Sequence, residues 1–146
     1  MNKKSNLQIQ TEVLLAKYIN RFLRYAKFSH IPLERKEILT GTLLYLLDEH
    51  DLVPDDVPHI GLLDDLLVFV EVARHFLGAE ASIPGVCNEE ELEKDIAFVD
   101  KHKGLMYGTQ AFSVTVIRRQ GQQAGNLPVL CSRIRAKYSY LGGLEK

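Results

Sequence analysis

Long apolar runs and a secretion signal are both missing from this sequence of 146 residues. The longest apolar candidate, residues 38–47, contains Thr40, Gly41 and Thr42, and it falls short of the ~18 uninterrupted apolar residues of a transmembrane helix. Polar residues closely follow the first lysines, so the N-terminus lacks the apolar core of a signal peptide. We therefore expect a cytoplasmic protein.

Cysteine is scarce, and several catalytic signatures are missing as well. Cys87 and Cys131 are too few for a disulfide scaffold and have no paired metal-ligand spacing, so free or buried thiols are expected. The chain has no Gly-x-Ser-x-Gly motif, no phosphate-binding glycine loop and no dinucleotide fingerprint. EF-hand and His-Glu-x-x-His spacings are also lacking. No familiar class of enzyme is therefore indicated, and a binding role is favoured over catalysis.

What the sequence does contain is an ordinary core and strongly segregated charge. The length and a hydrophobic content of 46% predict a single domain over residues 1–146. The formal net charge is −1. Counted by segment, it is +5 over residues 1–40, −13 over 41–100, +2 over 101–110 and +5 over 111–146. An acidic centre between two basic ends indicates internal charge matching, or a separate partner for each sign of charge.

Residues 50–65, which we call the elbow, have the most specific spacing in the chain. Pro54 and Pro58 lack an N–H and push the residues before them out of the α region. Gly61 adds a position where the backbone can adopt a positive φ or approach another segment closely. The elbow should therefore turn one helix, ending near residue 48, into another that starts near residue 62. Both prolines are expected to lie outside regular helix, and Asp64 and Asp65 should lie in the first turn of the second helix, facing its dipole.

The pattern Asp51-Leu-Val-Pro54-Asp55, followed by Pro58, Gly61 and Asp64-Asp65, resembles the YkvA-like domain, a bacterial domain of unknown function. The resemblance covers about residues 36–77. It implies a helical hairpin with an Asp-Pro-rich elbow and assigns no reaction.

Apolar spacing of three to four residues predicts a mainly α-helical bundle around this hairpin. The predicted helices span residues 7–28, 33–49, 62–77 and 89–103. In the first, Lys17, Arg21 and Arg24 form a basic stripe that we expect to face solvent, opposite a core face that includes Tyr18. In the fourth, Ile96 and Val99 give only a modest core face.

The basic C-terminal extension, residues 105–146, is the most ambiguous segment. Residues 112–117 alternate and are β-branched, which favours a short β strand. Spacing alone would also allow a helix over 109–119. From residue 127 onward, either a returning strand or a helix opened by Pro128 fits. Ile134, Tyr138 and Leu141, at three- to four-residue spacing, favour the helix.

The elbow raises a metal hypothesis. Hard cations take oxygen ligands, and histidine adds nitrogen for zinc or iron. The candidate ligands are Asp51, Asp55, Asp64, Asp65 and His59. The competing explanation is that the aspartates cap backbone N–H groups of the elbow and the following helix. We favour capping, and expect no cofactor, with a divalent metal as the alternative.

The basic ends raise a second hypothesis. Arginine and lysine with interleaved tyrosines suit contact with polyanions, and a basic amphipathic helix suits an anionic membrane surface. The candidate residues are Arg118, Arg119, Arg133, Arg135 and Lys137. The sequence thus predicts a cytoplasmic helical binding or scaffolding protein, with a protein partner or a second copy of itself. The two alternatives are a metal-binding protein or metal-dependent enzyme, and an adaptor for nucleic acid or the membrane periphery.

Overall fold

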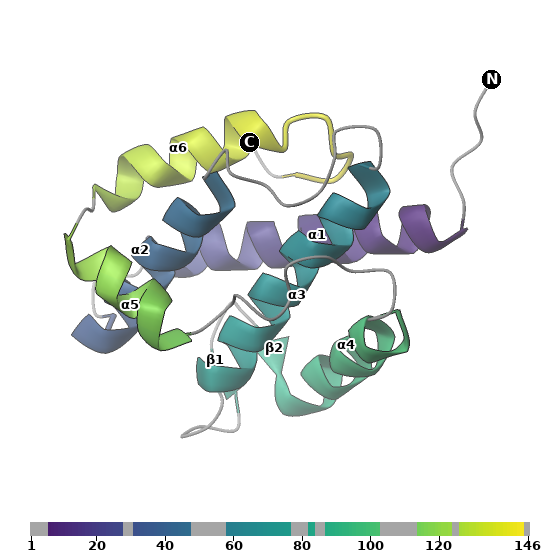
Figure 1. The fold of residues 1–146 in the computed structure, drawn as a ribbon, viewed down its shortest axis with the longest axis horizontal. Coiled ribbons are helices and arrows are strands. Elements are labelled where there is room, and N and C mark those ends of the chain that lie inside the picture. The colour runs from purple at the N-terminus through teal and green to yellow at the C-terminus, as the bar shows by residue number, and fades with distance from the viewer. Residues whose placement is uncertain are drawn as a thin grey trace.

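The computed structural model describes residues 6–27, 31–47, 58–76, 82–83, 87–102, 114–123 and 126–144. These residues are mainly helical, which confirms the predicted class (Figure 1). Their elements in chain order are α1 (Asn6–Tyr25), α2 (Leu33–Leu47), α3 (Pro58–Phe76), β1 (Ser82–Ile83), β2 (Cys87–Asn88), α4 (Glu89–Lys101), α5 (Val114–Gln123) and α6 (Leu127–Lys137). In this described part of the chain, no helix combines the length and apolarity needed to cross a membrane.

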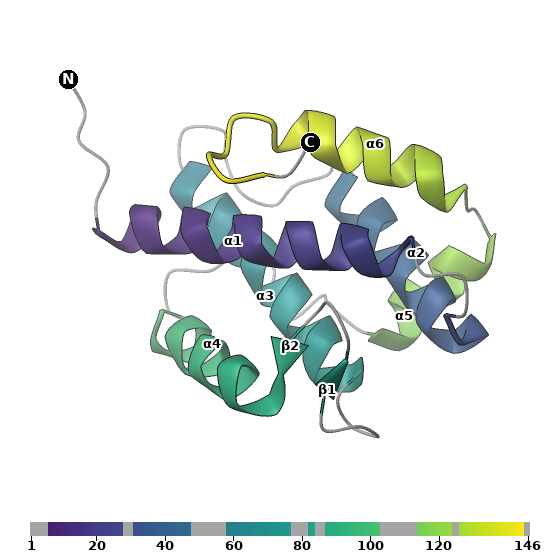
Figure 2. The ribbon, with the colours of Figure 1, turned by 180° about the vertical axis from the view of Figure 1, so that it is seen from behind.

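Helix α3 lies at the centre of the bundle, between α1, α2 and α4 (Figures 1 and 2). Its side chains from Leu66 to Val70 are all buried, and so are Val72 and Ala73. A helix that is apolar on most sides has to be covered on most sides. Helix α1 covers one of them, where the rings of Phe22 and Phe69 meet edge to face with centroids 4.9 Å apart.

The start of α3 differs from the prediction. The helix begins at Pro58, which we expected to lie outside regular helix. Proline is favoured in the first turn because its N–H would have no partner there and its φ already suits a helix. Asp64 and Asp65 are consequently the seventh and eighth residues of α3, and its first turn holds no acidic residue. The prediction that Asp64 and Asp65 interact with the helix dipole is therefore wrong, because the stabilisation of negative charge by the dipole is confined to the first turn.

Helices α2 and α5 pack at very close range through two glycines. A Cβ built on Gly41 would lie 1.8 Å from the Ile117 carbonyl oxygen, and one built on Gly121 would lie 1.9 Å from the Glu37 carbonyl oxygen. Backbones can approach so closely only where a side chain is missing. Ile117, one turn before Gly121, is buried in the same contact.

This contact explains why the β segment expected at residues 112–117 is wrong. Residues 114–117 belong to α5, and no described residue of the last third forms a strand. Strand preference reflects the packing surroundings more than the backbone. Here a helix places Ile117 and Gly121 on one face, four residues apart, where both meet α2. The short ladder lies earlier in the chain, where Ser82 pairs with Asn88 and Ile83 with Cys87 in antiparallel register.

Helix α6 follows the sequence prediction closely. The Asn126 side chain accepts a hydrogen bond from the Val129 N–H, and Pro128 lies in the first turn. Ile134, Tyr138 and Leu141 are all buried, as their spacing predicted. The chain then turns at Gly143, whose φ is +98°.

The glycine contact yields a test of the α2–α5 packing. Gly41→Ala and Gly121→Ala should each lower the free energy of unfolding by about 1–3 kcal/mol or more, because the new methyl group meets backbone that cannot rotate away. Gly142→Ala is the matched control, since a Cβ there has nothing within 4 Å. Urea denaturation of the three variants measures the difference. Equal stabilities of all three would contradict the close contact.

Candidate functional site

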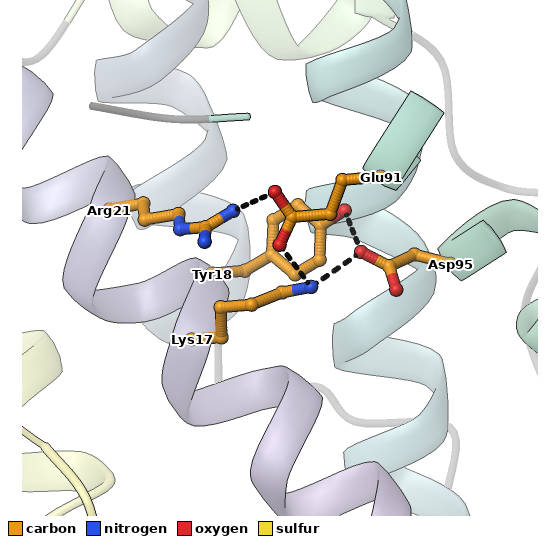
Figure 3. Close-up of polar contacts among 5 residues, drawn as sticks. All are labelled: Lys17, Tyr18, Arg21, Glu91 and Asp95. Carbon is orange, nitrogen blue, oxygen red and sulfur yellow. Dashed lines mark hydrogen bonds and ion pairs between the residues drawn. The ribbon is translucent and has the colours of Figure 1, made fainter. Parts of the chain in front are cut away.

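A cluster of polar side chains joins α1 to α4, and we call it the α1–α4 cluster (Figure 3). It consists of Lys17, Tyr18, Arg21, Glu91 and Asp95. The first three lie within five residues of α1, and the two carboxylates lie four residues apart on α4. That spacing puts both carboxylates on one face of α4, directed at α1.

Asp95 is the buried centre of the cluster, with 5% of its surface exposed. Its Oδ2 accepts a hydrogen bond of 2.6 Å from the Tyr18 hydroxyl and one of 2.7 Å from the Lys17 Nζ (Figure 3). Tyr18 is fully buried. Short bonds to an ionised carboxylate are stronger than neutral ones, and they supply what a buried charge requires.

Glu91 forms the outer part of the cluster. Its Oε1 accepts from the Lys17 Nζ at 3.0 Å, and its Oε2 lies 2.8 Å from Arg21 Nη1. The hydrogen bond from Arg21 lowers the pKa of Glu91, the Lys17 bond and both positive charges add to this, and partial burial opposes it. Lys17 thus bridges the two carboxylates.

The cluster is arranged to hold two helices together. Every donor and acceptor just described points at another member, and in the part of the chain that the structure describes no buried side-chain N or O lacks a partner. Replacing a buried ion pair by apolar residues is often neutral, whereas removing one partner is strongly destabilising. The cluster therefore determines where α4 packs more than it adds to overall stability.

Sequence analysis missed this site. Lys17 and Arg21 were expected on a solvent-facing stripe and Tyr18 in an apolar core. Asp95 was not singled out. A signal was present: Asp95 follows Leu92 by three residues and precedes Val99 by four, and both are buried. A carboxylate on the apolar stripe of a helix requires a buried partner.

A second set of contacts ties the C-terminal extension to α2 and α3. The Tyr138 hydroxyl donates a 2.6 Å hydrogen bond to Asp65 Oδ2. The Lys137 Nζ donates to the Leu46 carbonyl in the last turn of α2, where a cation complements the helix dipole. Asp65, one of the elbow aspartates, thus accepts a hydrogen bond from a tyrosine that is 73 residues away in the sequence.

The remaining elbow candidates lie largely beyond what the structure describes. Asp51, Pro54 and Asp55 are outside the described residues. Their predicted role in capping or metal binding therefore stays a prediction. Pro58, His59, Gly61 and Asp64 have described backbone in α3, but their side chains are outside the description. Among the side chains that are described, no three His, Cys, Asp or Glu residues are grouped to hold a metal ion.

The five basic candidates differ in their surroundings. Arg118 donates to Glu37 Oε1 through Nε and Nη2, both at 3.2 Å, and Lys137 bonds α2 as described above. Arg119 and Arg133 are exposed, and Arg135 is half-buried. Two of the five thus serve intramolecular contacts.

Cys131, the one cysteine whose side chain is described, is buried in α6. Burial raises the pKa of its thiol, and the charges of Arg135 and Lys27 only partly oppose this. A thiol with a raised pKa is a poor nucleophile at neutral pH. This agrees with the buried thiol expected from the sequence.

Substitutions at Asp95 and Tyr18 test the cluster. Asp95→Ala removes the carboxylate that the buried Tyr18 hydroxyl binds and leaves the Lys17 ammonium with Glu91 alone. It should lower the free energy of unfolding by about 3 kcal/mol. Tyr18→Phe should cost about 1–2 kcal/mol, since Asp95 keeps Lys17. The double variant should cost less than the sum, as measured by urea denaturation. Strict additivity would show that the two side chains do not interact.

The lowered pKa of Glu91 gives a pH prediction. A carboxyl whose folded pKa lies below its usual 4.5 stabilises the fold above that pH and loses the effect as the pH falls through the folded pKa. The stability difference between the wild type and Glu91→Gln should be constant near neutrality and shrink as the pH falls below 4.5. Denaturation curves at several pH values measure it, and a difference independent of pH would contradict the contact.

Comparison with known proteins places the elbow in a wider group. No curated protein and no solved structure matches the chain. Residues 35–70 match the model of a family described as "Protein of unknown function (DUF1232)". The match spans most of α2, the elbow and most of α3, and it agrees with the resemblance to the YkvA-like domain. This quarter of the chain is therefore similar to an uncharacterised domain family.

Proposed function

We propose that the chain is a helical binding or scaffolding protein that catalyses no reaction of its own. One observation supports this best: the charged and hydroxyl side chains of the α1–α4 cluster bind one another. In the α1–α4 cluster, both carboxylates are neutralised by neighbouring cations. General acid–base catalysis would instead need a carboxylate with a raised pKa, and the pKa of Glu91 is lowered.

The packing supports a single domain over residues 1–146. Buried apolar residues of α1, α2, α3, α4 and α6 form one continuous cluster, and one such core is what a single domain contains. The hairpin of residues 36–77 then supplies the centre of the domain, and the C-terminal extension packs on it through Tyr138 and Lys137. Such a protein would bind its partners through its solvent-exposed surface. We place it in the cytoplasm or at the membrane periphery.

The rival function is metal binding by the elbow aspartates. Metal binding stabilises a folded protein that holds the ion, so it has a direct signature in thermal unfolding. We expect the melting temperature of the wild type to be the same with calcium, magnesium, zinc or a chelator. A rise of several degrees with one ion would overturn the proposal, provided that Asp64→Asn and Asp64→Ala both abolish it.

The control for this experiment comes from α4. Glu93→Gln removes an exposed acidic charge that lies far along the sequence from the elbow. It should leave any metal-dependent shift unchanged. A shift that Glu93→Gln also removes would reflect non-specific binding to an acidic protein, and would leave the proposed binding role in place.

A further inference from the structure

In Figure 2, α6 runs across the top of the view in the direction opposite to α1 below it. The turn after α6 lies along α1, where the Asn20 side-chain amide donates a 2.8 Å hydrogen bond to the Gly143 carbonyl. A Cβ on Gly143 would lie 3.9 Å from the Ala16 methyl. The outer side of α1 and the turn that follows α6 therefore form one continuous surface, which we call, with the adjoining part of α6, the α1–α6 face.

One end of this face carries exposed apolar side chains. Ile9 and Val13, one turn apart on α1, are 47% and 63% exposed. Tyr140, 61% exposed, lies in the turn after α6, which reaches α1 where Gly143 faces the Ala16 methyl.

The other end of the face is cationic. Lys27 is exposed just after the last turn of α1, and Arg135 lies one turn after Cys131 on α6. The charges of both act on the Cys131 thiol, in agreement with this placement. Arg24 is exposed in the last turn of α1. The basic residues of α1 nearer its middle, Lys17 and Arg21, point to α4 instead. The positive charge of this face is thus concentrated at one end.

From these observations we propose that the α1–α6 face binds the surface of an anionic membrane. Helices that lie in a membrane interface combine apolar side chains with basic ones on the side that faces the lipid. Residues 9 and 27 are about 27 Å apart along a helix, so a planar surface can contact both ends at once. Exposed aliphatic side chains add little to nucleic-acid binding, which relies on cations and aromatic stacking.

This inference deepens the proposed binding function by naming the partner, and it rests on that function. Vesicles of phosphatidylcholine alone and of phosphatidylcholine with phosphatidylglycerol provide the test, by co-sedimentation with the full chain. The wild type should bind only the anionic vesicles, and added salt should weaken the binding.

The two ends of the face predict different variant phenotypes. Lys27→Glu with Arg135→Glu should lower binding at least about 25-fold, since each basic residue near such a surface contributes about fivefold. Val13→Ser should lower binding while leaving its salt dependence unchanged. Lys94→Glu, an exposed charge reversal on α4, is the matched control and should bind like the wild type.

Several results would overturn the inference: no binding of the wild type to anionic vesicles, equal loss in Lys94→Glu, or binding to a single-stranded oligonucleotide but not to vesicles. Thermal melts of each variant confirm that the fold persists. The metal-dependent melts described above test the proposed function by a separate measurement, so its failure and the failure of the membrane inference can be told apart.

Discussion

The need to neutralise the buried carboxylate of Asp95 constrains the packing of α4 more than any other contact. Helix α4 has few buried apolar side chains, chiefly Leu92 and Val99, and these alone would allow several orientations against α3. The bonds from Lys17 and Tyr18 to Asp95 admit one orientation. Because an unpaired buried charge is far more costly than a lost apolar contact, the alternatives are disfavoured.

The same principle explains the segregated charges of the chain. Basic α1 meets acidic α4 through Lys17 and Arg21, and the basic C-terminal extension is tied to the centre of the fold by Arg118, Tyr138 and Lys137. The charge asymmetry between α1 and α4 is therefore matched internally, by segments distant in the chain. Lys27 and Arg135, on the α1–α6 face, take no part in these contacts, and the membrane proposal rests on them.

The close contact of α2 and α5 adds a second constraint, of shape. Gly41 lies inside the segment that matches the uncharacterised family, whereas Gly121 lies in the extension beyond it. The matching segment, residues 35–70, thus has backbone without a covering side chain at Gly41, and α5 packs directly against it. The matching segment and the extension therefore depend on each other for burial.

The sequence by itself determined the helical class, most helix positions and the buried side chains of α6, because apolar spacing along a helix is a local property. The first-turn Pro128 of α6 is local in the same way. The partner of Asp95, the helical state of residues 114–117 and the role of Asp65 depend on residues dozens of positions away. Only the tertiary structure decided these, because a buried charge or a bare glycine surface shows that a partner is needed but does not identify it.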